Sequence, residues 1–166
     1  MTVRPIRLLG DARLYEHSVA VAREELPAIA TLVVDLHDTL LDFRRRYGAG
    51  RAIAAPQIGV MKRLIYVSSD RPTVLVNPVL GQLSQETMEV WDDCMCFPDL
   101  LVRVMRHKSC RIGFHDQNWQ FVQWDLSGNL AELLQHEYDH LDGILAVARA
   151  IDGQSFALRS QKALLT

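Results

Sequence analysis

The chain has 166 residues, of which 49% are hydrophobic, and a formal net charge of −2. This length and composition fit one domain with a sizeable core, which we place at residues 1–166. The charge gives no sign of a nucleic-acid-binding patch, and no apolar run is long enough to span a membrane. Because residues 1–7 lack the apolar stretch of a signal peptide, we expect a soluble, cytoplasmic protein.

Three cysteines, Cys94, Cys96 and Cys110, lie within seventeen residues of one another. An odd number argues against a secreted disulfide framework and favours reduced thiols or a metal ligand. Cys110 falls in an alternating segment typical of a strand, where a small buried side chain is the ordinary interpretation.

The first fifteen residues are expected to form an irregular arm. From 26 to 47 the apolar residues recur at helical spacing, and Gly48 ends the pattern, which predicts an N-terminal helix. Short runs with the composition of strands follow at 63–68, 73–78, 102–105 and 110–114.

A second helix is expected to begin near Ser127 and to run to about Leu141. Asp125 or Ser127 is a plausible N-cap, and Gly143 is a plausible stop. The order of helix, strands and helix predicts an α+β fold with short, mostly antiparallel strands rather than alternating βαβ units.

The second helix carries the chemistry, in the segment Gln135-His136-Glu137-Tyr138-Asp139-His140. His136 and His140 are four residues apart, so both imidazoles project from one helix face and can reach one metal ion. Glu137 follows the first histidine, where a carboxylate can exchange a proton with a water that the metal activates. This pattern predicts a metal-dependent hydrolase.

The third ligand is not given by this helix. Zinc proteases with an extended motif place a histidine where this chain has Ala146, and the chain has no glutamate after Glu137. The donor must come from upstream, or from Asp142 or Asp152. Upstream, Cys94 and Cys96 compete on spacing, since a thiolate is an excellent ligand for zinc or iron(II).

Three separated blocks of the sequence resemble the peptide deformylase family in the same order. Residues 50–57, GRAIAAPQ, resemble the family's G-x-G-L-A-A-P-Q, and residues 92–96, DDCMC, resemble its E-G-C-L-S. Residues 135–143 keep every fixed position of Q-H-E-x-D-H-L-x-G. The resemblance implies strands packed around a central, C-terminal metal-binding helix.

The resemblance also implies roles for particular residues. Cys94 takes the place of the metal cysteine, while Cys96 takes that of a serine. The Gln57 amide and the Met95 backbone N–H take the places of the two oxyanion donors, and Glu137 that of the proton carrier. Asp92 stands at the glutamate that pairs with an arginine, here Arg106, to brace the cysteine loop.

The implied reaction removes the N-formyl group from the initiator methionine of new polypeptides and releases formate. The implied cofactor is one divalent metal, iron(II), with zinc or nickel as alternative occupants. Transient association with the ribosome stays open, although the tail offers no strongly basic helix. Two other hypotheses are hydrolysis of a different N-formyl compound and a catalytically idle paralogue that binds peptide N-termini.

The residues expected to contact substrate are Gly50, Arg51, Ala52, Asp93 and Leu133. Three of them depart from the family pattern: Arg51 replaces an apolar pocket residue, and Ala52 and Asp93 replace glycines. The Arg51 guanidinium either reaches solvent and buries only its stem, which we favour, or faces the pocket and selects a carboxylate.

Overall fold

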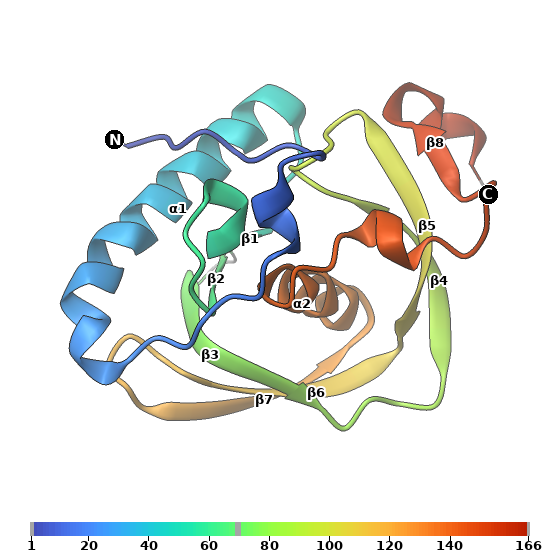
Figure 1. Ribbon diagram of the computed structural model, residues 1–166. Coiled ribbons are helices and arrows are strands. Elements are labelled where there is room, and N and C mark those ends of the chain that lie inside the picture. The colour runs from blue at the N-terminus through green and yellow to red at the C-terminus, as the bar shows by residue number, and fades with distance from the viewer. Residues whose placement is uncertain (1, 69–70, 166) are drawn as a thin grey trace.

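The computed structural model describes residues 2–68 and 71–165, and Figure 1 shows its arrangement. Its two α-helices are α1 (Leu26–Tyr47) and α2 (Gly128–Leu141). Its strands are β1 (Ala52–Ala54), β2 (Leu64–Val67), β3 (Thr73–Gly81), β4 (Thr87–Asp93), β5 (Leu100–His107), β6 (Ser109–His115), β7 (Phe121–Ser127) and β8 (Phe156–Leu158). Short 3₁₀ helices lie at Ala12–Tyr15, Arg23–Glu25, Ala55–Ile58, Ala146–Arg149 and Arg159–Leu164.

The strands form two sheets, in which every pair of strands is antiparallel. The larger sheet has the order β1-β2-β3-β6-β7, and the smaller one has the order β4-β5-β8. Helix α2 lies between the sheets, with β3, β6 and β7 on one side and β4 and β5 on another, whereas α1 lies apart from β4 and β5 (Figure 1). The expected α+β fold with a central C-terminal helix is therefore confirmed.

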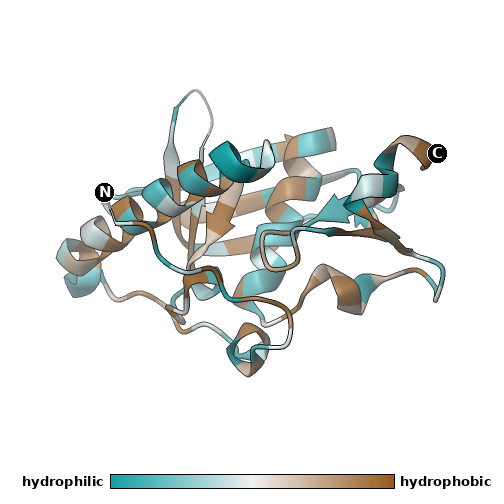
Figure 2. Ribbon diagram, turned by 90° about the horizontal axis from the view of Figure 1, so that it is seen from above, coloured by the Kyte–Doolittle hydropathy of each residue, from teal (hydrophilic) through white to brown (hydrophobic). Residues whose placement is uncertain are grey.

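Helix α1 is amphipathic, as its periodicity predicts. Its buried face includes Ile29, Leu36, Leu40 and Phe43, and in Figure 2 its ribbon alternates between brown and teal. The helix ends at Gly48, whose positive φ of 67° suits a residue without a side chain. This apolar face packs against β1 and β2 and so holds the chain that enters the site.

Helix α2 is buried on almost every side, and its polar residues must therefore find partners inside the protein. Gln135 exchanges two hydrogen bonds of 2.9 Å with the backbone of His107, which docks the helix on the end of β5. Ser127 is the residue before the helix but makes no side-chain cap bond, and Asp125 pairs with Arg111 instead. The helix is thus placed by tertiary packing rather than by an N-cap.

The described residues include no helix that is both long and apolar enough to cross a membrane.

Candidate metal centre and catalytic cavity

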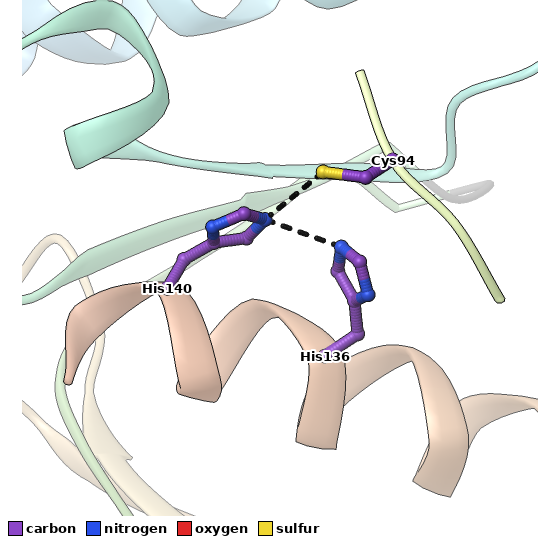
Figure 3. Close-up of side chains that lie close together, drawn as sticks. All are labelled: Cys94, His136 and His140. Atoms are coloured by element: carbon purple, nitrogen blue, oxygen red, sulfur yellow. Dashed lines mark hydrogen bonds between the residues drawn. The ribbon is translucent and has the colours of Figure 1, made fainter. Parts of the chain in front are cut away.

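Three buried side chains from two elements meet at one point (Figure 3). His136 and His140 stand one turn apart on α2, and their Nε2 atoms are 3.2 Å from each other. Cys94 lies in the turn that follows β4, and its Sγ is 3.3 Å from Nε2 of His140. The fold therefore brings the cysteine that follows β4 to the two histidines of α2, which lie far from it in the sequence.

The donor atoms fit a tetrahedral metal ion. Bond lengths of about 2.0–2.1 Å to nitrogen and about 2.3 Å to sulfur place neighbouring donors roughly 3.3–3.6 Å apart, close to the 3.3 Å and 3.2 Å between Nε2 of His140 and the donor atoms of Cys94 and His136. A thiolate with two imidazoles is also a donor set that zinc and iron accept. The three residues thus form a candidate metal site.

The other candidate ligands lie elsewhere. Asp142 forms an ion pair with Arg63, and Asp152 binds Ser155 and Arg103. Cys96 is buried near the site, but it is not part of the cluster of donor atoms that lie within 4.8 Å of one another. Cys94 is therefore the thiol best placed to complete the set.

Charge and burial set the protonation of the donors in the metal-free protein. Burial alone would lower the pKa of His136, but the adjacent Asp92 carboxylate outweighs it and raises that pKa to about 9. Burial and the charge of His136 lower the pKa of His140 well below its usual value. Burial raises the pKa of the Cys94 thiol. A metal ion at neutral pH must therefore displace protons from His136 and Cys94.

A chain of charged groups orients His136 from behind. Its Nδ1 is 3.0 Å from the Asp92 carboxylate, which also accepts a 2.7 Å hydrogen bond from Arg106. The same guanidinium binds Asp139 at 2.6 Å, and Arg149 binds that carboxylate through two hydrogen bonds of 2.6 Å. The expected Asp92–Arg106 pair is confirmed, and both of its side chains are buried.

Removing the central cation of this chain should destabilise the fold. In Arg106→Met, two buried carboxylates each lose a partner, so we expect the free energy of unfolding of the metal-free protein to fall by about 3–5 kcal/mol. Urea unfolding followed by circular dichroism measures it. Arg111→Met is the matched control, because Arg111 pairs with an exposed Asp125 and should cost less than about 0.5 kcal/mol. Equal losses in the two variants would contradict the role given to Arg106.

Glu137 and Gln57 face the same small cavity. Glu137 is 3% exposed, and its Oε2 has no hydrogen-bond partner among the described residues. Burial raises the pKa of this carboxyl to about 7. The Gln57 Oε1 accepts a 2.8 Å hydrogen bond from the Ala54 N–H, so the Nε2 group points inward, 3.7 Å from the sulfurs of Cys94 and Cys96. The bond to Ala54 supports the turn and also fixes the direction of the amide.

The cavity measures about 50 Å³ and gathers nearly all of the residues expected at the site. Of these only His140 does not line it; the others do, namely Gly50, Arg51, Ala52, Gln57, Asp93, Cys94, Met95, Leu133, His136 and Glu137. Strand β1, the cysteine turn and α2 thus supply three walls around the donor set.

Two of the residues that depart from the family pattern are held by ion pairs. Arg51 binds the Glu132 carboxylate through Nη2 and the Asn129 carbonyl through Nη1. Asp93 binds Arg159 at 2.8 Å, which ties the segment after β8 to the cysteine turn. The Arg51 guanidinium, which we expected to reach solvent, is half-exposed and lies at the cavity on a partner.

Sequence reasoning missed Glu132, Phe43 and Arg149. Glu132 precedes His136 by four residues, so helical spacing alone could have placed it at the site. Phe43 lines the cavity from α1, and Arg149 reaches Asp139 from a 3₁₀ helix. Nothing in the local sequence marks either of these contacts, because each depends on how distant elements pack.

A thiol and two imidazoles in one cluster, beside an unpaired buried carboxyl and an inward amide, are typical of metal-dependent hydrolases. The family model described as polypeptide deformylase matches residues 3–155. Peptide deformylase 2 of Ralstonia nicotianae is 35% identical over 165 residues, which cover 93% of this chain and 90% of the relative.

Two solved structures have the same fold. The crystal structure of peptide deformylase from Thermotoga maritima has a TM-score of 0.84 and 25% identity, covering 92% of this chain and all of that one. The class I type b peptide deformylase from Acinetobacter baumannii with Met-Ala-Ser bound has a TM-score of 0.80 and 30% identity, covering 89% and 98%. This chain therefore belongs to the polypeptide deformylase family, whose members are hydrolases.

Proposed function

We propose that this enzyme removes the formyl group from the N-terminal formyl-methionine of new polypeptides and releases formate. The observation that carries the proposal is the cluster of Cys94, His136 and His140 beside a cavity that Glu137 and Gln57 line, in a chain of the polypeptide deformylase family. The A. baumannii relative binds Met-Ala-Ser, a peptide that begins with methionine and so has the form of a deformylated product.

We assign one divalent metal ion to Cys94, His136 and His140. When bound, the ion lowers the pKa of a water molecule and polarises the formyl carbonyl. We propose iron(II) as the native metal, with zinc or nickel as alternative occupants, because a thiolate and two imidazoles suit all three. Asp92 holds the His136 ring by its Nδ1, which leaves Nε2 for the ion.

Within this site Glu137 is the proton carrier. Its carboxyl is buried beside the donor set, and a pKa near 7 lets it take a proton from water and give it to the leaving amine at neutral pH. Its Oε2 has no hydrogen-bond partner among the described residues, so this oxygen is available to water or substrate.

The oxyanion that forms when water adds to the formyl carbon needs hydrogen-bond donors that are already in place. The Gln57 Nε2 is one, since the bond from Ala54 to its oxygen keeps the nitrogen turned inward. The backbone N–H of Met95, in the turn directly after Cys94, is the second. Gly50, Arg51, Ala52, Asp93 and Leu133 are the proposed substrate contacts.

Formate release tests the proposal. Protein purified without oxygen and loaded with iron(II) should release one formate for each formyl-Met-Ala-Ser consumed, and removal of the metal with a chelator should stop the reaction. A coupled formate dehydrogenase assay measures the product. Metal-loaded protein that releases no formate from this peptide or from formyl-Leu, formyl-Asp and formyl-Lys peptides would show the proposal to be wrong and favour an idle paralogue.

New polypeptides are made in the cytoplasm, and we place the enzyme there with its substrate. Its three cysteines are free thiols, which suits that compartment. Association with the ribosome remains a proposal, and Arg159, one of the few cations of the tail, is already engaged by Asp93.

A further inference from the structure

An ion pair forms part of the wall of the catalytic cavity. Glu132 lies one helical turn before His136 on α2, and Arg51 directly precedes β1. The Arg51 guanidinium binds the Glu132 carboxylate and, through Nη1, the Asn129 carbonyl at 3.2 Å. Both side chains line the cavity together with Cys94, His136 and Glu137. The pair therefore lies beside the metal donors, where it can contact the side chain of a substrate's first residue.

The pair is stabilised because the Glu132 carboxylate is largely buried. The Glu132 side chain is only 13% exposed, while that of Arg51 is 51% exposed. A carboxylate with so little contact with water needs a cation beside it. Arg51 is also tethered by the Asn129 carbonyl, which limits how far the guanidinium can turn toward solvent. The wall that it forms with Glu132 is therefore ionic in the resting protein.

The cavity is also narrow. At about 50 Å³ it holds a few water molecules and is far below the several hundred Å³ typical of a ligand pocket. A substrate side chain that enters a cavity of this size contacts the residues of its wall, including the pair. A thioether forms no strong hydrogen bond with either ion and shields both from water, which is costly. A carboxamide of the same length accepts a hydrogen bond from Arg51 and donates one to Glu132.

We propose that the Arg51–Glu132 pair determines substrate choice, and that it lets the site accept N-formyl peptides whose first side chain is uncharged and hydrogen-bonding as well as those that begin with methionine. This inference rests on the proposed function and extends its substrate class beyond formyl-methionine. A charged side chain is a poorer match, because the pair is neutral and one of its ions would repel the newcomer. Neither residue is a metal donor or the proton carrier, so the pair acts on selectivity rather than on the chemical step.

Formyl-Met-Ala-Ser and formyl-Gln-Ala-Ser test this, since the two first side chains have nearly the same length and differ in polarity. Iron-loaded wild type should have a kcat/KM for the glutamine peptide within about tenfold of that for the methionine peptide. In the double variant Arg51→Leu with Glu132→Leu, the wall becomes apolar, and the ratio should move toward methionine by about 10–100-fold. Metal content should stay at one ion per chain.

A matched control replaces an ion pair of the same kind far from the cavity. Arg111→Leu with Asp125→Leu removes an exposed pair between β6 and β7 and should leave the ratio unchanged. The single variants Arg51→Leu and Glu132→Leu each leave one ion without its partner, so both should lose activity on both peptides. A second readout needs no variant: calorimetric titration of wild type with Gln-Ala-Ser and Met-Ala-Ser should give dissociation constants for the two products that agree within about tenfold.

The possible outcomes distinguish failure of this inference from failure of the proposed function. Formate release from both peptides with more than about a tenfold preference for methionine in wild type, or with a ratio that the double variant leaves unchanged, would overturn the inference and leave deformylation standing. Binding of Met-Ala-Ser more than about tenfold tighter than that of Gln-Ala-Ser by wild type would also overturn it. No formate from either peptide with metal bound would overturn the proposed function, and the inference with it.

Discussion

The Glu137→Gln variant is expected to bind one metal ion per chain and to release formate at least about a hundredfold more slowly than wild type. Glutamine keeps the size of the side chain but cannot carry a proton between water and the leaving amine. Because Glu137 is not one of the three metal donors, Cys94, His136 and His140, the metal should remain bound. Elemental analysis and the formate assay on the same preparation measure both quantities. Glu86→Gln, at an exposed glutamate that pairs with Lys108, is the control and should match wild type.

The same variant has a pH signature in the metal-free protein. Burial raises the pKa of Glu137 from about 4.5 to about 7 on folding, so the folded state holds this proton more tightly than the unfolded chain does. The stability that this gives is present below pH 4.5 and is lost as the pH rises through 7. Glutamine is neutral throughout, so the variant should be more stable than wild type by up to roughly 3 kcal/mol above pH 7.

That difference should shrink toward pH 4.5 and vanish below it, where the wild-type carboxyl is protonated in both states. Urea unfolding of chelator-treated protein at pH 5 and pH 8 measures it. Normal turnover with metal bound would remove Glu137 from the mechanism, and a stability difference independent of pH would show that the carboxyl is not buried as described.

Sequence patterns predicted the elements whose apolar residues are regular. The helix expected at 26–47 has those bounds, and Gly48 ends it. The strands expected at 63–68 and 110–114 correspond to β2 and β6, whose residues are mostly buried. In these segments apolar residues recur at the spacing of a helix or a strand. The structure buries those residues, so the local pattern and the tertiary packing agree.

The strands that were not predicted have weaker local signals. Strand β4 carries acids at its end and alternates between exposed and partly buried residues. Strand β7 is exposed along most of its length, and β8 has three residues that pair only with β5. Each depends on a neighbouring strand for its hydrogen bonds, and the sequence of the segment does not reveal that neighbour.

The site residues also divide into those that the sequence predicted and those that it did not. Helical spacing placed His136 and His140 on one face, and the family resemblance selected Cys94 over Cys96. The partners that tune the site come from packing: Arg149 reaches Asp139, and Glu132 meets Arg51 across two elements. The assignment of residues 1–166 to one domain and the roles of individual site residues stay predictions.

The Cys94→Ala variant is expected to bind metal at least about a hundredfold more weakly than wild type and to be recovered without it after dialysis. The thiolate is the only anionic donor of the set, and two imidazoles that remain do not hold a divalent ion at low concentration. Loss of a residue that merely orients a ligand already costs about 10–100-fold. Titration with zinc under reducing conditions, against a competing chromophoric chelator, measures the affinity.

Cys96→Ala is the matched control for Cys94→Ala. It removes a buried thiol two residues away that lies outside the cluster of donor atoms. This variant should keep one ion per chain, because Cys94, His136 and His140 remain. Circular dichroism of both variants separates loss of the metal from loss of the fold. If Cys94→Ala retained a full complement of metal while Cys96→Ala lost it, the thiolate ligand would be Cys96, and the cysteine turn would have to rearrange when the ion binds.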